Sequence, residues 1–135
     1  MKTIIRVDLI ITKYTTTHAE LTKFLGIAPS NAVNTGDITF NSKLKATVEP
    51  INEWTLSSDI NSEKPLEDHI LRIIEIIKPQ REKFLEISMQ AEVYLKAVIE
   101  FYGDYNPYID FSSDLFKEMA KMNLELTTSI YFFSE

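Results

Sequence analysis

Apolar and polar residues alternate most regularly over residues 91–101, which read AEVYLKAVIEF. Successive side chains of a β-strand point to opposite faces, so this pattern predicts a long strand with one apolar and one polar face. The polar face would carry Glu92, Tyr94, Lys96 and Glu100. We expect this strand in the middle of an antiparallel sheet that is backed by helices on the apolar side.

The same alternation recurs elsewhere in the chain. It is typical of an antiparallel or mixed sheet with one open side, because strands buried on both faces are apolar throughout. The further predicted strands are residues 3–12, 51–58 and 124–133, with a short hairpin formed by residues 38–40 and 46–48.

Helix signals lie between these strands. Thr17 and Glu20 have the spacing of a capping box, and Gly26 suits the left-handed position that ends a helix. A longer helix is predicted from the spacing of its apolar residues, which is that of one helical face. Those residues are Leu66, Ile70, Ile73, Ile74 and Ile77, and further helical segments are predicted at residues 80–88 and 112–122.

The element order predicts a single α+β domain over residues 1–135. We expect a two-layer sandwich, with a mainly antiparallel sheet and helices packed on one face. Residues 26–50 are irregular and rich in turn-forming residues. A loop of this length in a compact domain is usually functional or partly disordered, so this segment is a candidate recognition element.

Composition excludes several classes of function. The 135 residues include no cysteine, which rules out disulfides, thiol nucleophiles and cysteine-based zinc sites. The net charge of −6 disfavours binding to nucleic acid. No apolar run is long enough for a membrane span, and Arg6 and Asp8 interrupt any signal-peptide core. We expect an acidic, cytoplasmic protein with no nucleic-acid or membrane partner.

The residues that carry most catalytic chemistry are sparse. The two histidines, His18 and His69, belong to different predicted elements and have no second metal ligand at a suitable spacing. The glycines are isolated, so no phosphate-binding loop is predicted. Trp54 alternates with Leu56 and is expected in the core. We predict no catalytic residue, no metal and no cofactor, and the chain is more typical of a binding protein than of an enzyme.

The best candidate for a binding surface is the polar face of the predicted sheet. Tyrosines flanked by charged residues are common in surfaces that bind proteins. The alternative is an ordinary solvated sheet face with cross-strand pairs. The candidate binding residues are Arg6, Glu92, Tyr94, Lys96, Glu100 and Tyr131.

Several segments together resemble a bacterial family known as domain of unknown function 4279. They are LTKFLGIAP at residues 21–29, WTLSS at 54–58, LEDHILRIIEII at 66–77 with Lys78 and Pro79 after it, and residues 114–124 before the last predicted strand. The resemblance covers nearly the whole chain through the order and spacing of these segments. It implies a fold and brings no catalytic residue.

We therefore expect a non-enzymatic domain that binds a protein partner. One alternative is an immunity-type protein that neutralises a basic toxin. Another is a small-molecule-binding protein or enzyme, with a pocket under the 26–50 loop where Trp54 or Tyr94 meets Arg6 or a histidine. A third is self-association through an edge strand or the open sheet face.

Overall fold

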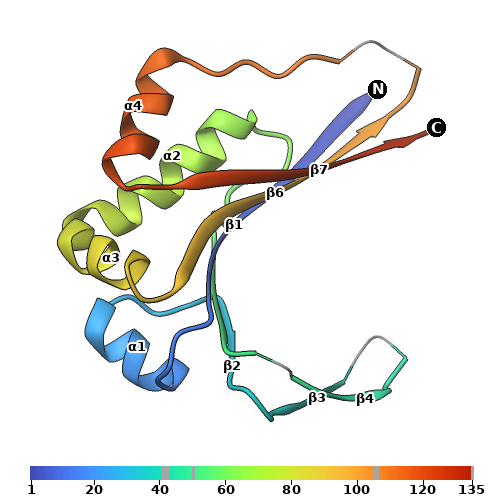
Figure 1. The fold of residues 1–135 in the computed structure, drawn as a ribbon. Coiled ribbons are helices and arrows are strands. Elements are labelled where there is room, and N and C mark those ends of the chain that lie inside the picture. The colour runs from blue at the N-terminus through green and yellow to red at the C-terminus, as the bar shows by residue number, and fades with distance from the viewer. Residues whose placement is uncertain (41–42, 50, 105–106, 135) are drawn as a thin grey trace.

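The computed structural model describes residues 1–40, 43–49, 51–104 and 107–134 (Figure 1). The strands are β1 (Lys2–Thr12), β2 (Asn31–Val33), β3 (Ile38–Phe40), β4 (Ala46–Val48), β5 (Glu53–Ser57), β6 (Glu92–Tyr102) and β7 (Glu125–Phe133). The helices are α1 (His18–Leu25), α2 (Leu66–Ile77), α3 (Arg81–Ser88) and α4 (Ser113–Lys121), with the 3-10 turn η1 (Lys78–Gln80) between α2 and α3.

Five strands form one mixed sheet in the order β2-β5-β1-β6-β7. Neighbours are antiparallel except β6 and β7, which are parallel and joined through α4. The middle strand is β1, which pairs with β6 along its whole length from Lys2–Tyr102 to Thr12–Glu92. The expectation that residues 91–101 form the middle strand was therefore wrong by one position, because alternation identifies a strand's faces and not its neighbours.

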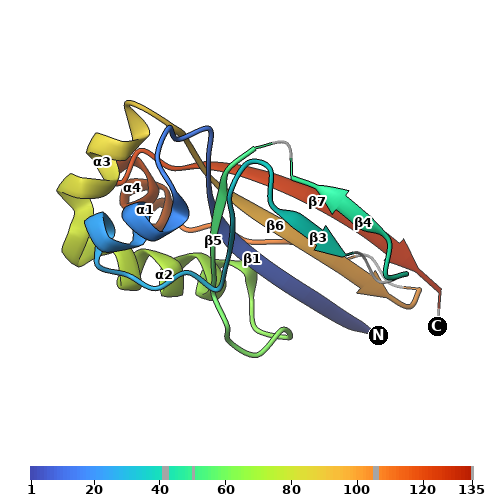
Figure 2. The ribbon, with the colours of Figure 1, turned by 90° about the horizontal axis from the view of Figure 1, so that it is seen from below.

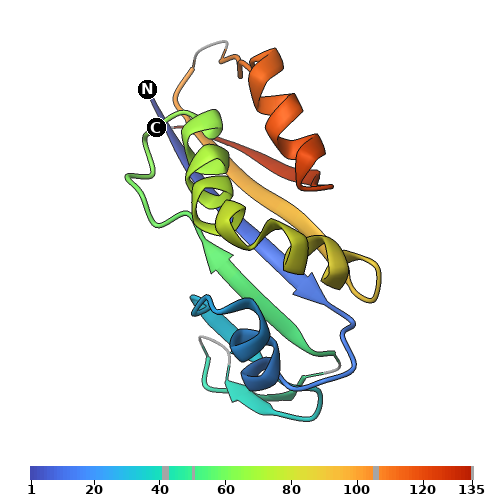
Figure 3. The same ribbon diagram turned by 90° about the vertical axis from the view of Figure 1, so that its left-hand side faces the viewer.

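The helices all lie on one side of this sheet, as Figure 3 shows from the helix side. Side chains of β1 and β6 meet the apolar stripe of α2 there, and Leu9, Leu95, Ile70 and Ile73 are fully buried. Burying an aliphatic side chain of this size stabilises the fold by about 1.5–3 kcal/mol. The predicted α+β sandwich, with helices on one face of a mainly antiparallel sheet, is confirmed.

The predicted helix ends are largely confirmed. The Thr17 side chain accepts a hydrogen bond from the Glu20 amide at 3.2 Å, but the Glu20 carboxylate accepts from the Thr16 hydroxyl instead of completing a capping box. Ser112 caps α4 by accepting from the Leu115 amide at 3.1 Å. These caps satisfy amides that have no partner within the first turn of a helix.

The segment 26–50 contains more structure than its turn-rich sequence suggests. The predicted hairpin is present as β3 and β4, and it projects from the sheet on the side away from the helices (Figures 1 and 2). The sequence did not predict β2, which pairs Ala32 with Trp54 at one edge of the sheet. A strand of three residues flanked by turn formers has too little alternation to be predicted.

No helix in the described ranges is long and apolar enough to cross a membrane.

Candidate binding groove on the open sheet face

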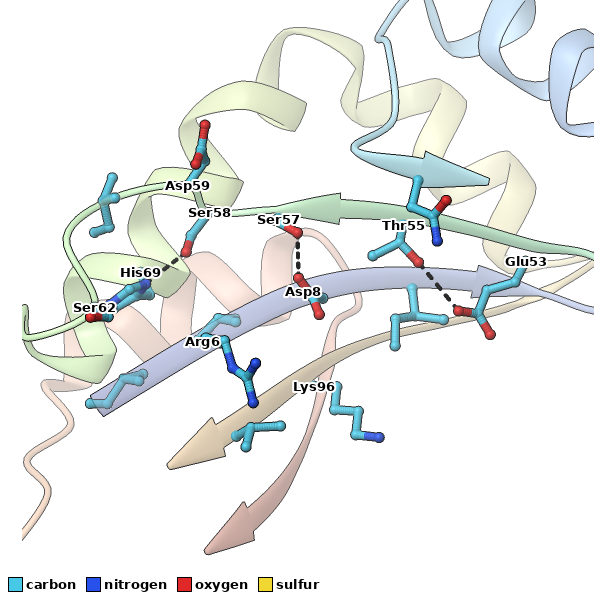
Figure 4. A pocket seen from close by; sticks show the side chains of 16 residues that line it. Arg6, Asp8, Glu53, Thr55, Ser57, Ser58, Asp59, Ser62, His69 and Lys96 are labelled. Atoms are coloured by element: carbon cyan, nitrogen blue, oxygen red, sulfur yellow. Dashed lines mark hydrogen bonds between the residues drawn. The ribbon is translucent and has the colours of Figure 1, made fainter. Parts of the chain in front are cut away.

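A groove of about 620 Å³ lies on the face of the sheet that carries no helix (Figure 4). Its floor is formed by side chains of β1, β5 and β6, and its end is formed by the loop that follows β5. Apolar contact comes from Ile10 and Val98, and the polar groups have charges of both signs. The polar lining includes Arg6, Asp8, Glu53, Thr55, Ser57 and Lys96.

The groove exists because β5 follows β1 along only part of its length. β5 pairs with residues Asp8 to Thr12 of β1, and the chain then turns away at Asp59, which has a left-handed φ of 52°. The loop after β5 covers the rest of the β1 edge through two main-chain bonds. The Ser58 amide donates to the Val7 carbonyl at 3.0 Å, and the Ile5 amide donates to the Ser62 carbonyl at 2.8 Å.

Asp8 is the acidic centre of the groove. It pairs in register with Ser57 on one side and with Lys96 on the other. The Ser57 hydroxyl donates to Asp8 Oδ1 at 2.6 Å (Figure 4). A carboxylate accepts several hydrogen bonds, so Asp8 has capacity for a further donor from a bound partner. Donors and acceptors thus alternate across the strands, an arrangement that suits a polar ligand such as a peptide.

A buried polar pair, Ser58 and His69, closes the end of the groove. The Ser58 hydroxyl lies 2.6 Å from His69 Nδ1, and the two side chains are 5% and 1% exposed. Burial lowers the pKa of His69, while the negative charge of Asp68 and the nearby main chain of Asn61 and Lys64 oppose that shift. Nε2 has no hydrogen bond of normal geometry within the described ranges. The contact between the Ser58 hydroxyl and His69 Nδ1 therefore holds the loop after β5 against α2.

This pair does not have the arrangement of a nucleophile and its base. A serine nucleophile must reach the substrate, and Ser58 is almost fully enclosed. The burial of His69 favours a structural role for this side chain. In the described ranges, no group of three or more histidine, aspartate or glutamate side chains is placed to hold a metal ion.

All six predicted binding residues lie on the open face, but only Arg6 and Lys96 line the groove. Glu100 lies beside Arg6, with Oε1 at 3.8 Å from the guanidinium, and its other oxygen accepts from the Tyr102 hydroxyl at 3.0 Å. Tyr131 is opposite Glu100 in the register of β6 and β7. The Arg6–Glu100 pair is long and the Arg6 side chain is exposed, so the pair contributes little stability and leaves Arg6 available to a partner.

Glu92 and Tyr94 lie at the other end of β6, outside the groove lining. Glu92 forms an ion pair with Lys13 at 2.9 Å. Tyr94 is opposite Ile10 in the sheet register, and burial, followed by the charges of Glu53 and Glu92, raises the pKa of its hydroxyl. These two residues belong to the rim of the sheet and do not cluster with Arg6.

The candidate residues predicted from the sequence do not include the β5 side of the groove, where Thr55 and Ser57 line it. Thr55 and Ser57 alternate with Trp54 and Leu56, so the signal that places them on the open face was present in the strand pattern. The expectation that Trp54 lies in the core is confirmed, and Trp54 is not part of the groove lining. Trp54 is fully buried on the helix side, where its indole N–H donates to the Thr22 hydroxyl at 3.0 Å. From the 26–50 segment, Asn31 lines the groove.

Comparison with known proteins identifies one family. A profile of the family described as Domain of unknown function (DUF4279) matches residues 3–133. The match extends from β1 to the end of β7 and so includes every strand and helix that forms the groove. No curated protein and no solved structure matches the chain.

Proposed function

The chain belongs to the family described as Domain of unknown function (DUF4279), and we propose that it is a non-enzymatic domain that binds a polypeptide partner on its open sheet face. The observation that carries the proposal is the groove between β1, β5 and β6, on the face that the helices leave uncovered. The cysteine-free composition also fits our proposal of a cytoplasmic location.

The shape and lining of the groove favour a polypeptide over a small molecule. The groove is open along the sheet, and its walls alternate charges and hydroxyl groups over an apolar strip of Ile10 and Val98. Small-molecule sites usually enclose most of the ligand's surface and carry only a few polar groups. An extended segment of a partner would place side chains of either charge against Asp8 and Lys96, and its main chain against Ser57.

Neutralisation of a basic toxin is the more specific form of this proposal. The net charge of −6 supports it, since opposite charge accelerates association. The acidic groups of the open face support it less, because Glu92 already pairs with Lys13 and Glu100 lies beside Arg6. A partner segment with both charges is therefore the better match to the groove.

Site-specific photocrosslinking in the native host tests the proposal. A photoreactive amino acid is placed at Arg6 or Lys96 in the groove, and at Leu71 or Lys117 on the helix side as controls. We expect discrete protein adducts at the open-face positions and none at the controls. Adducts that form only at the helix-side positions would contradict the proposal.

Binding of the crosslinked partner, once purified, gives a quantitative test. Lys96→Glu reverses a groove charge, and Lys117→Glu makes the same change on α4. We expect Lys96→Glu to weaken binding at least about tenfold, as loss of a good interfacial charge pair does. Lys117→Glu should leave affinity unchanged, and equal affinities for the two variants would argue against the groove.

A further inference from the structure

The two edges of the five-stranded sheet differ in how they are protected. Edge strands expose unpaired main-chain groups that can pair with another chain, and proteins usually protect them by short length, lysine, proline or a covering segment. One edge is β2, which has only three residues. The other edge is β7, which has nine residues and contains no lysine, proline or glycine.

The C-terminal half of β7 has exposed side chains on both of its faces. On the helix side, Ile130 is 46% exposed and Phe132 is 71% exposed, so no helix overhangs the strand there. On the open side, Tyr131 and Phe133 are also exposed. Within the described ranges, β7 pairs with β6 alone. Within the described ranges, β7 is thus a long edge strand with exposed apolar side chains, the kind of edge that can pair with another chain.

The direction of the free main-chain groups follows from one hydrogen bond. The Phe133 carbonyl accepts from the Gly103 amide at 3.0 Å, so the main-chain groups of Phe133 point toward the β6 side. In a strand these directions alternate with each residue. The N–H and C=O groups of Leu126, Thr128, Ile130 and Phe132 therefore point outward, away from β6.

We infer that two copies of this chain associate through β7, in antiparallel register about a two-fold axis at Ser129. Ser129 is the midpoint of Glu125–Phe133, so this register pairs the full length of the strand with itself. Leu126 lies opposite Phe132, and Thr128 lies opposite Ile130. In both pairs the outward main-chain groups face one another, as an antiparallel ladder requires.

The side chains of β7 are compatible with this self-pairing. Glu125 is the only charged residue of the strand, and the register places the two copies of Glu125 at opposite ends of the contact. Phe132, the most exposed of the large apolar side chains of the strand, gains Leu126 as an apolar neighbour. The β7 strand of a second copy is therefore complementary to β7, and the two sheets become one continuous sheet.

This inference is independent of the proposed function, since β7 contributes no residue to the groove lining.

Sedimentation or light scattering of the full-length protein over a range of concentrations tests the association. We expect a dimer that dissociates on dilution. Phe132→Lys adds a charge to the contact, and Ile130→Pro removes an outward N–H, so each should weaken dimerisation at least about tenfold. Phe116→Lys changes an exposed phenylalanine of α4 and should leave the dimer intact. Thermal melts confirm that each variant is folded.

Cysteine crosslinking tests the register, because the native chain has no cysteine. Paired non-hydrogen-bonded residues have Cα atoms about 4.5 Å apart, which allows a disulfide. Ser129→Cys should therefore form a disulfide-linked dimer on mild oxidation. Thr127→Cys, which lies opposite Tyr131 in this register, should not. A wild-type monomer at all concentrations, a dimer disrupted by Phe116→Lys alone, or crosslinking at 127 without 129 would overturn the inference.

Discussion

The hydroxyl of Ser58 lies 2.6 Å from Nδ1 of His69, and this contact joins the end of β5 to the first turn of α2. Both side chains are buried, so the bond forms in a region from which water is largely excluded. The loop between them covers the part of β1 that β5 leaves unpaired. This pair therefore holds in place one end of the groove.

We predict that Ser58→Ala destabilises the fold by about 1–3 kcal/mol, the typical cost of leaving a buried polar group without its partner. Ser57→Ala is the matched control, because Ser57 is adjacent and its hydroxyl bonds to Asp8 in the more exposed groove. Urea unfolding measures both free energies. A loss no greater for Ser58→Ala than for Ser57→Ala would contradict the structural role of the pair.

The burial of His69 predicts a pH dependence of stability. Burial lowers the pKa of His69 in the folded state, so the unfolded chain binds the proton more tightly. The contribution of neutral His69 to the unfolding free energy is complete above the unfolded pKa of about 6.5. It is lost as the pH falls through the folded pKa, with a slope of at most about 1.4 kcal/mol per pH unit. His69→Gln removes this titration, and unfolding free energies measured between pH 5 and 7 compare the two proteins. Equal slopes would contradict the prediction.

The same histidine shows what sequence alone can reveal about packing. His69 follows Leu66 by three positions and precedes Ile73 by four, so it falls on the apolar stripe of the predicted helix. Helical spacing therefore predicts the burial of His69. It does not predict the partner of His69, because Ser58 belongs to a different element and the contact depends on how the loop after β5 folds.

Some features of the sheet are predicted by local sequence patterns, and others depend on pairing between distant segments of the chain. The alternation of residues 91–101 correctly separates Leu95 on the helix face from Lys96 on the open face, because side-chain direction is a local property of a strand. The parallel pairing of β6 with β7, and the central position of β1, depend on long-range pairing that alternation does not encode. The groove follows from that pairing, so Arg6 and Lys96 were predicted from the sequence as candidates and Ser57 was not.

The bond between Trp54 and Thr22 predicts a second site of stability. It joins β5 to α1, and the indole is fully buried. Thr22→Val keeps the shape of the side chain but leaves the indole N–H without an acceptor, which should cost about 1–3 kcal/mol. Thr22→Ser keeps the hydroxyl and should cost less. Trp54 is the only tryptophan, so its fluorescence reports unfolding directly. Equal stability of the two variants would contradict the role of this bond.

Gly26 ends α1 in the left-handed region, with φ of 70°, and its amide donates to the Thr22 carbonyl at 2.8 Å. A Cβ atom at this position would meet nothing within 4 Å, so the cost of Gly26→Ala arises from backbone conformation and not from a clash. We predict that Gly26→Ala lowers the unfolding free energy by about 1 kcal/mol or somewhat more. Gly26→Asn should cost less, because asparagine adopts this conformation more readily. Chemical denaturation of both variants measures the difference, and an alanine variant as stable as the wild type would show that the helix end relaxes out of the left-handed region.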